Sequence, residues 1–326
     1  MGKDKWAVGI DLGGTKIEIA LVDTKGEIKD RQRFPTDSSK GYKVVLGHTI
    51  DAIKKIRTNN KKIRLHSIGI GVAGQIDKAT GTIKYSPNLN WRNVSLQKDL
   101  FRKLQIPVAV CNDVKAAMFG EWLHGSGKNC NDLVCVFVGT GIGGAIISGG
   151  KVLEGFNNTA GEIGHMVINI HGPQCHCGNH GCFEALAGGW AIQRDVEDSV
   201  KKNKAAGKLL LQIAEGDIKN ITAKTIVEGL KHKDKLSKEL TENFTKALIA
   251  GGTSIVNAFG PQRIIFGGGI IEGFPGLLIK VEKGIRQNAL QAATASLKVL
   301  PAKLHNDSGV VGAAAFAFHT FKKRKK

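Results

Sequence analysis

Histidine and cysteine side chains cluster in one stretch of the chain with the spacing of metal ligands. Cys175, Cys177 and Cys182 fall within eight residues, and His165 precedes them in the segment Glu-Ile-Gly-His. One imidazole and three thiolates make a closed four-coordinate set, which is typical of a structural Zn²⁺ site. Competing ligands in the same stretch are His171, His176 and His180. The alternative is a group of free buried thiols beside an unrelated histidine, but such crowding in a cytoplasmic chain favours metal.

Glycine-rich turns occur at three predicted strand ends. They are Asp11-Leu12-Gly13-Gly14-Thr15-Lys16, Gly139-Thr140-Gly141-Ile142-Gly143-Gly144 and Gly267-Gly268-Gly269. Backbone N–H groups without a neighbouring Cβ can approach phosphate oxygens, and a carboxylate at a strand end can hold Mg²⁺ through water. The first turn lacks the Walker A spacing, and the second has strands on both sides, which argues against a dinucleotide-binding fingerprint. Taken alone, the first turn is more simply an ordinary hairpin; three such turns favour a nucleotide held in a two-lobed cleft. The predicted contacts to ATP and Mg²⁺ are Asp11, Gly13, Gly14, Thr15, Lys16, Thr140, Gly141, Gly267 and Gly268.

The pair Asn112-Asp113 lies between a predicted strand and a predicted helix and is the candidate catalytic centre. A carboxylate at the carboxyl end of a strand can act as general base toward a substrate hydroxyl. The alternative is that Asp113 only caps the helix behind it, which is the commonest role of Asp at such a position.

Apolar periodicity predicts the elements that position these residues. Strands are expected over residues 5–11, 17–23, 27–34, 67–72, 107–111, 133–138, 145–147 and 263–266. Helices are expected over residues 41–58, 113–123 and 309–321, after a Ser95 cap, and through most of 188–259. The order strand, glycine turn, strand opens two halves of the chain, which indicates a weak internal duplication of topology. The pattern predicts an α/β protein of two lobes, with mixed sheets flanked by helices and a cleft between the lobes.

The chain is strongly basic, with 47 Lys and Arg against 28 Asp and Glu and a formal net charge of +19. The charge is dispersed apart from the terminal block 322–326, and no nucleic-acid-binding motif accompanies it, so we predict no specific nucleic-acid partner. No stretch reaches eighteen uninterrupted apolar residues, and the first residues do not form a signal sequence. We therefore predict that the protein is cytoplasmic and has no membrane partner.

These motifs together resemble the ROK family of bacterial sugar kinases and sugar-responsive repressors, and above all its glucokinases. The resemblance runs from Val8 to the final predicted helix and is most specific in three places: Glu-x-Gly-His with the cysteine loop, Asn112-Asp113, and the Asp-x-Gly-Gly-Thr opening. It implies a two-lobed actin/hexokinase-like (ribonuclease H-like) ATPase fold. The smaller lobe would comprise residues 1–113 and the returning helix 309–326, and the larger lobe residues 114–308. A homodimer is also implied.

The resemblance further implies that the ATP γ-phosphate is transferred to the 6-hydroxyl of glucose, with Asp113 as catalytic base. The positions that match the family's sugar-binding residues are Gly74, Asn88, Asn112, Asp113, Glu162, His165 and Glu184. His165 would both ligate zinc and touch the sugar. Val114 and Lys115 stand where the family usually has small residues.

Kinases of N-acetylglucosamine, N-acetylmannosamine, fructose or mannose remain alternatives within the family, and a sugar-responsive regulator is the competing class. ROK repressors carry a helix-turn-helix before the Asp-x-Gly-Gly-Thr region, and only ten residues precede Asp11 here. We therefore favour the enzyme.

Overall fold

A computed structural model describes residues 5–203 and 205–323, which divide into two compact units. The first unit contains the chain up to Asn129, residues 154–160 and the chain from Lys303 onward; the second contains residues 130–153 and 161–302. The boundary falls after Asn129 and not after Asp113, because helix α3 (Asp113–Leu123) packs closely against α12 (Ser308–Lys323) in the first unit.

A five-stranded mixed sheet forms the centre of the first unit, in the order β3-β2-β1-β4-β8. Its strands are β1 (Trp6–Leu12), β2 (Lys16–Asp23), β3 (Ile28–Pro35), β4 (Leu65–Val72) and β8 (Val108–Asn112). β1 pairs antiparallel with β2 and parallel with β4, and β8 continues the parallel part beside β4. The carboxyl ends of β1, β4 and β8 therefore lie at one edge of the sheet, where the first candidate site residues are found.

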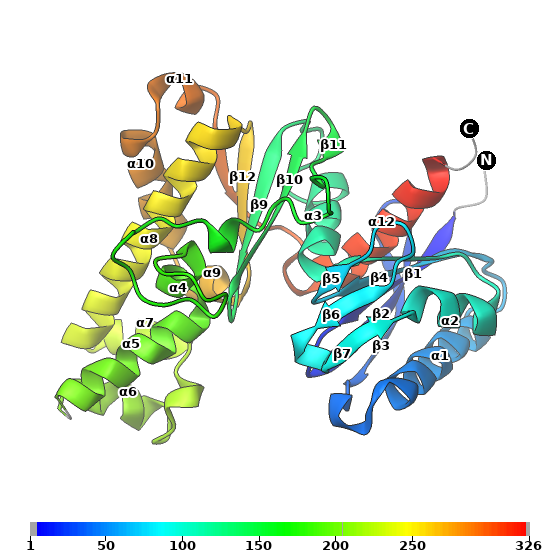
Figure 1. The fold of residues 1–326 in the computed structure, drawn as a ribbon, viewed down its shortest axis with the longest axis horizontal. Coiled ribbons are helices and arrows are strands. Elements are labelled where there is room, and N and C mark those ends of the chain that lie inside the picture. Colours follow the sequence, from blue (N-terminus) through cyan, green and yellow to red (C-terminus); the bar gives the residue numbers. More distant parts are fainter. Residues whose placement is uncertain (1–4, 204, 324–326) are drawn as a thin grey trace. The chain divides into compact units, whose positions relative to one another are not determined.

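Alternate residues of β1 face two different helical layers (Figure 1). Val8 packs in the core that includes α1 (Tyr42–Asn59) and α2 (Leu96–Leu104), whereas Ala7 packs against α12. Gly9 makes the close approach of α12 possible, because a Cβ at this position would lie 1.9 Å from the carbonyl oxygen of Val310.

Short elements complete the first unit. A small sheet contains β5 (Gln75–Ile76), β6 (Ile83–Ser86) and β7 (Trp91–Val94), none of which apolar periodicity predicted. The 3-10 helices of the first unit are η1 (Ser38–Lys40), η2 (Pro87–Leu89) and η5 (His305–Asp307). Ser95 is the N-cap residue of α2 as expected, but its side chain makes no capping hydrogen bond.

The second unit repeats the sheet of the first. Its order is β11-β10-β9-β12-β13, with β9 antiparallel to β10 and parallel to β12. The strands are β9 (Leu133–Val138), β10 (Ile142–Ser148), β11 (Lys151–Val152), β12 (Arg263–Gly267) and β13 (Lys298–Pro301). In each sheet two antiparallel pairings are followed by two parallel pairings, so the predicted duplication is present in the strand topology.

Helices of the second unit surround a large apolar core that includes Val136, Phe183, Leu248 and Phe266. They are α4 (Phe183–Ala187), α5 (Gly189–Lys202), α6 (Lys208–Ile213), α7 (Ala223–Lys231), α8 (Lys235–Phe259), α9 (Gly269–Gly273), α10 (Leu277–Asn288) and α11 (Gln291–Thr294), with the 3-10 helices η3 (Ile163–His165) and η4 (Ile218–Asn220). The predicted helical region 188–259 corresponds to α5 to α8. The predicted loop 267–269 is wrong, since Gly267 ends β12 and Gly269 begins α9.

Within residues 5–203 and 205–323, no helix combines the length and the apolar character that crossing a membrane requires.

Candidate active site

Two carboxylates meet at the sheet edge of the first unit. Asp11 lies near the end of β1, and Asp113 follows directly after β8. β4 lies between them: Gly71 pairs with Asp11 on one side and with Cys111 on the other. A Cβ on Gly71 would lie 3.3 Å from the Cα of Asp113, so glycine at this position keeps the sheet edge open for the start of α3. The parallel register thus brings together two acidic residues that are far apart in the chain.

Burial raises the pKa of both carboxyl groups. Burial, helped by the negative charge of Asp113, raises the pKa of Asp11 to about 6, and Lys16 opposes the shift. Burial also raises the pKa of Asp113, which a hydrogen bond from the N–H of Val114 partly offsets. Carboxyl groups in such an environment are suited to accepting a proton near neutral pH or to holding a cation between them.

The helix cap of α3 comes from Asn112 and leaves Asp113 a different role. Asn112 Oδ1 accepts hydrogen bonds from the N–H groups of Val114 (2.9 Å) and Lys115 (3.3 Å). Its Nδ2 donates to the carbonyl oxygen of Gly74 at 3.3 Å, so the Asn112 amide holds two predicted sugar-site segments together. Asp113 occupies the first helical position, and its Oδ1 also accepts the Val114 N–H at 2.9 Å. Because Asn112 already caps the helix, capping does not by itself account for a buried carboxylate at position 113.

The first glycine turn is tightly closed and lies beside another predicted sugar residue. The Gly13 N–H donates to the carbonyl oxygen of Lys16 at 3.0 Å, and Thr36 Oγ1 donates to the carbonyl oxygen of Gly13 at 2.6 Å. A Cβ on Gly14 would lie 2.8 Å from the carbonyl oxygen of Asn88. The predicted nucleotide turn and Asn88 are therefore in contact within the first unit.

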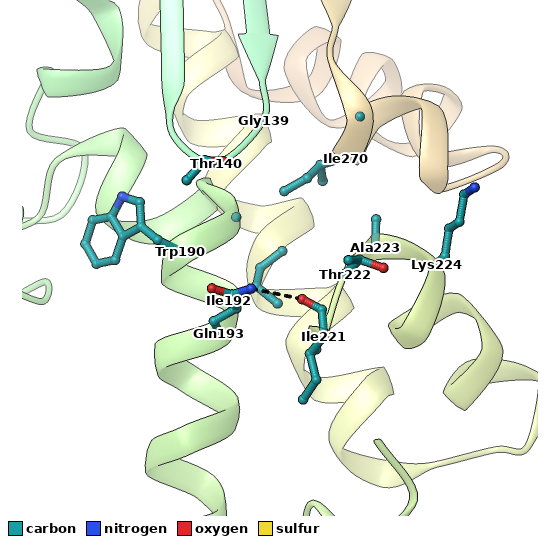
Figure 2. A pocket seen from close by; sticks show the side chains of 12 residues that line it. Gly139, Thr140, Trp190, Ile192, Gln193, Ile221, Thr222, Ala223, Lys224 and Ile270 are labelled. Atoms are coloured by element: carbon teal, nitrogen blue, oxygen red, sulfur yellow. Dashed lines mark hydrogen bonds between the residues drawn. The ribbon is translucent and has the colours of Figure 1, made fainter. Parts of the chain in front are cut away.

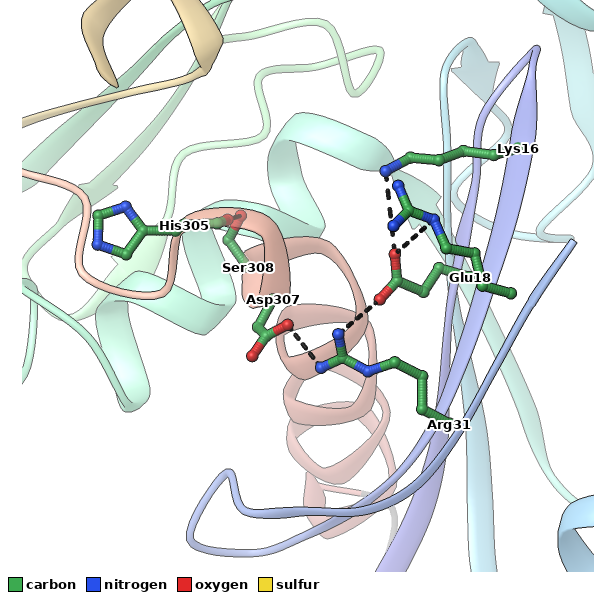
Figure 3. Close-up of polar contacts among 7 residues, drawn as sticks. Lys16, Glu18, Arg31, His305, Asp307 and Ser308 are labelled. Carbon is green, nitrogen blue, oxygen red and sulfur yellow. Dashed lines mark hydrogen bonds and ion pairs between the residues drawn. The ribbon is translucent and has the colours of Figure 1, made fainter. Parts of the chain in front are cut away.

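Lys16 belongs to a charged cluster centred on the buried carboxylate of Glu18 (Figure 3). Lys16 Nζ lies 3.9 Å from Glu18 Oε2, and Arg31 NH1 lies 3.0 Å from Glu18 Oε1. Arg31 also forms an ion pair with Asp307 at 2.6 Å, which joins β3 to the turn before α12. The cluster lies at the end of the hairpin that carries the glycine turn, and the Lys16 side chain remains 45% exposed.

Lys115 has a role that no motif in the sequence predicted. Its Nζ donates to Asn158 Oδ1 at 2.6 Å and to Glu154 Oε1 at 3.3 Å, and the side chain is only 12% exposed. Asn158 Nδ2 in turn donates to the carbonyl oxygen of Ile76 at 3.0 Å. These contacts attach residues 154–160 to the first unit, beside the start of α3. The sequence held one signal for this role: Lys115 stands where the family that the motifs resemble usually has a small residue.

The second unit contains a cavity of about 510 Å³ beside the second glycine turn. Figure 2 shows its wall, which comes from the glycine turn, α5, the start of α7 and α9. The lining residues are Gly139, Thr140, Gly189, Trp190, Ile192, Gln193, Ile221, Thr222, Ala223, Lys224, Gly269 and Ile270. Gln193 Nε2 donates to the carbonyl oxygens of Lys219 (3.1 Å) and Ile221 (3.3 Å), which fixes α5 to the opposite wall. A largely apolar cavity that ends at a glycine turn suits a purine nucleoside whose phosphates extend toward the turn.

Thr140 lines this cavity, whereas Gly267 and Gly268 pack against protein. A Cβ on Gly267 would lie 2.8 Å from the Ala302 side chain, and one on Gly268 would lie 2.4 Å from the carbonyl oxygen of Val138. Gly269, the next residue, is the one that reaches the cavity wall. Glycine at 267 and 268 is explained by close packing against neighbouring elements. No sequence motif singled out Trp190 or Gln193, which lie on α5.

Glu184 lies behind the second glycine turn and is bound by two protein donors. Its Oε2 accepts the N–H of Ile142 at 2.8 Å, and its Oε1 accepts Trp190 Nε1–H at 3.3 Å. A Cβ on Gly141 would lie 2.2 Å from Glu184 Oε2, so glycine at 141 admits the carboxylate. Glu184 therefore links the turn to α5 in this structure.

The cysteine loop brings four candidate metal ligands together. One donor atom each from His165, Cys175, Cys177 and Cys182 lies within 4.8 Å of every other. Cys177 Sγ and Cys182 Sγ are 3.7 Å apart, as are Cys175 Sγ and His165 Nδ1. Tetrahedral Zn²⁺ with bonds of about 2.0 to 2.3 Å separates its ligand atoms by roughly 3.5 to 3.8 Å, so the donor set fits zinc.

The three competing histidines lie outside that group of four; the ring of His176 stacks on Trp190 instead. Glu162 directly precedes η3, which carries His165. The predicted sugar residues thus form one set in the first unit (Gly74, Asn88, Asn112 and Asp113) and another in the second (Glu162, His165 and Glu184).

Comparison with known proteins assigns the family. The model of the ROK family matches residues 7–320. The chain belongs to the ROK family. It is 32% identical to the glucokinase of Halalkalibacterium halodurans, over 95% of this chain and 94% of that protein. It is also 30% identical to the xylose repressor of Bacillus subtilis, over 98% of this chain and 78% of that protein.

Among solved structures, this ROK protein resembles the ROK family glucokinase from Streptomyces griseus in complex with glucose and AMPPNP. The TM-score is 0.79 and the identity is 30%, with 96% of this chain and 99% of that chain covered. The two-sheet α/β fold expected from the sequence is therefore confirmed.

Proposed function

We propose that this ROK protein is an ATP-dependent hexose kinase that transfers the γ-phosphate of ATP to the 6-hydroxyl of glucose. The relatives named as glucokinases match nearly the full chain, and the S. griseus structure contains glucose and an ATP analogue. The observation that carries the proposal is the buried carboxylate of Asp113 beside Asp11, at a helix start that Asn112 already caps.

In this mechanism Asp113 accepts the proton of the sugar 6-hydroxyl as the oxygen attacks the γ-phosphorus of ATP. The bond from the γ-phosphorus to the bridging oxygen breaks, and ADP leaves with that oxygen. The raised pKa of Asp113 makes its carboxylate a stronger base than an exposed aspartate. Asn88, Asn112, Glu162, His165 and Glu184 bind the sugar hydroxyls, together with the backbone at Gly74.

The nucleotide occupies the cavity of the second unit, and its phosphates bind the glycine turns. The proposed contacts are Thr140 and Gly141 in the second turn, and Asp11, Gly13, Gly14, Thr15 and Lys16 in the first. Asp11 is the residue that would hold Mg²⁺, which neutralises charge on the transferred phosphoryl group when bound. Because the pKa of Asp11 is about 6, binding a cation would favour its ionised form.

His165, Cys175, Cys177 and Cys182 would hold one Zn²⁺, whose role is to fix the shape of the cysteine loop. Elemental analysis of protein purified without added metal should find one zinc per chain. A Cys177→Ser, Cys182→Ser double variant should lose it. Zinc that is retained undiminished in the double variant would refute the ligand assignment.

The catalytic assignment is tested with Asp113→Asn. Asparagine preserves the shape of the side chain but accepts no proton, so glucose-dependent ADP release should fall by about 10²- to 10⁴-fold while glucose binding persists. Asp51→Asn, an exposed change on α1, serves as the matched control and should keep full activity. Near-normal turnover of Asp113→Asn at saturating glucose would refute the role of Asp113 as base.

A panel of sugars decides the substrate. The wild type is assayed with glucose, mannose, fructose, N-acetylglucosamine and N-acetylmannosamine, and we expect the highest kcat/KM with glucose. Glu162→Gln and Asn88→Ala should raise the KM for the preferred sugar, because each removes a hydrogen-bond partner from a hydroxyl. Preference for an N-acetylated hexose would replace glucose by that substrate and leave the kinase mechanism in place.

We also propose that the protein acts in the cytoplasm as a homodimer. Its proposed substrate ATP supports the location, and the family resemblance supports the dimer. Light scattering of the purified protein measures the assembly directly. The dispersed charge predicts nucleic-acid binding that is weak and lost at physiological salt.

A further inference from the structure

The cysteine loop contacts the wall of the cavity through one pair of rings. His176 lies between the ligands Cys175 and Cys177, and its imidazole stacks on the indole of Trp190. The ring centroids are 4.0 Å apart, and the ring planes differ by 22°. Trp190 lines the cavity and is seen at one side of it in Figure 2. One face of the indole therefore meets a residue whose two neighbours are candidate metal ligands.

Trp190 is joined to the second glycine turn by two further contacts. Its backbone N–H donates to the carbonyl oxygen of Thr140 at 3.0 Å. Its Nε1–H donates to Glu184 at 3.3 Å, and the same carboxylate accepts the N–H of Ile142 at 2.8 Å. The position of the indole and the position of the turn are therefore coupled, because Glu184 binds both.

We propose that His176 and Trp190 are positioning residues for the phosphate-donor nucleotide. The metal-held loop presents His176 to Trp190, and Trp190 orders the cavity wall and, through Glu184, the glycine turn. This inference rests on the proposed function, since it assigns the cavity to the nucleotide. It adds that the residue between the first two cysteine ligands influences nucleotide affinity, although it is neither a ligand nor a sugar contact.

The proposal predicts a selective loss of nucleotide affinity when the stack is removed. Stacked aromatic pairs contribute enough free energy that His176→Ala should raise the Kd for a non-hydrolysable ATP analogue by roughly two- to tenfold. His176→Phe keeps a flat ring at this position and should restore the wild-type Kd. The zinc content should stay at the wild-type value in both variants, and the Kd for glucose should change less than the Kd for the nucleotide, because Glu184 is also a proposed sugar contact.

The measurement is isothermal titration calorimetry of the full-length protein with the ATP analogue alone and with glucose alone, together with elemental analysis. His180→Ala is the matched control, because His180 is exposed in the same loop and is outside both the ligand group and the stack. It should leave all three quantities unchanged.

An unchanged nucleotide Kd in His176→Ala would overturn the proposal. Equal weakening of glucose and nucleotide binding would also overturn it, because that result would mean a general disturbance of the loop. Loss of zinc would overturn it as well, because it would make His176 a ligand. Failure of the proposed function has a different signature: the wild type itself would bind no nucleotide, and both ideas would fall. If the wild type binds the nucleotide and His176→Ala binds it equally well, only the positioning role is refuted.

Discussion

Replacing Asp11 by asparagine should stabilise the protein at neutral pH in the absence of divalent cations and ATP. The carboxylate is largely buried at the end of β1, close to Asp113. It also packs closely on α12, where a Cβ on Gly309 would lie 2.6 Å from Asp11 Oδ2. Ionised, the group carries a desolvated charge next to a second acidic residue; asparagine has the same shape without the charge.

The pKa values set the size and the sign of the effect. The pKa of Asp11 is about 6 in the folded protein, against an ordinary value of 3.8 for an aspartate exposed to water. The folded state therefore keeps this proton to higher pH than the unfolded state. The resulting stabilisation is complete below pH 3.8 and is lost as the pH rises through 6. A difference of about two pKa units corresponds to about 3 kcal/mol, which is the most that Asp11→Asn should gain over the wild type at pH 7.5.

Urea unfolding followed by tryptophan fluorescence in EDTA, at pH 4.5 and pH 7.5, measures this difference. The gap between the two proteins should be small at pH 4.5 and widen at pH 7.5. Asp51→Asn, on the exposed face of α1, controls for the general effect of removing one negative charge from a basic protein. The reasoning is refuted if Asp11→Asn and the wild type show the same pH dependence. Asp11→Asn should also lose kinase activity, because the amide is a poorer partner for Mg²⁺.

Two further substitutions test how the first unit is assembled. Gly69→Ala should prevent α12 from packing on β4, because the new Cβ would lie 1.8 Å from the carbonyl oxygen of Ala313. Thermal unfolding measures the resulting loss of stability. Gly47→Ala, whose new Cβ would meet nothing within 4 Å, is the control and should be tolerated in this assay. Glu121→Ala should lower the free energy of unfolding by about 3 kcal/mol or more, because the buried carboxylate accepts three backbone N–H groups at 2.8 to 2.9 Å that would lose their partner. Urea unfolding checks the latter, and a loss below 1 kcal/mol, roughly the net value of one hydrogen bond, would contradict it.

Features that depend on neighbours in the chain could be predicted from the sequence. Most strands of the two five-stranded sheets and most of the long helices follow from apolar periodicity, and α3 begins and ends at the predicted residues. Cys175, Cys177 and Cys182 are so close in sequence that a short loop suffices to gather them, and His165, the fourth predicted ligand, lies in the same group. The sequence also predicted the duplication of strand topology, because each half opens with two strands joined by a glycine turn.

Features that depend on contacts between distant segments could not be predicted from the sequence and follow from the packing of the fold. The meeting of Asp11 and Asp113 depends on the register of three parallel strands, which no local pattern contains. The wall of the cavity comes from the glycine turn, α5, α7 and α9, so Trp190 and Gln193 had no motif to mark them. The sequence predicts that Gly268 belongs to a phosphate-binding turn. In the fold, the closeness of the Val138 backbone explains why this position has no side chain. Residue types and spacing show which chemistry is available, and packing between segments far apart in the chain decides which of those groups meet.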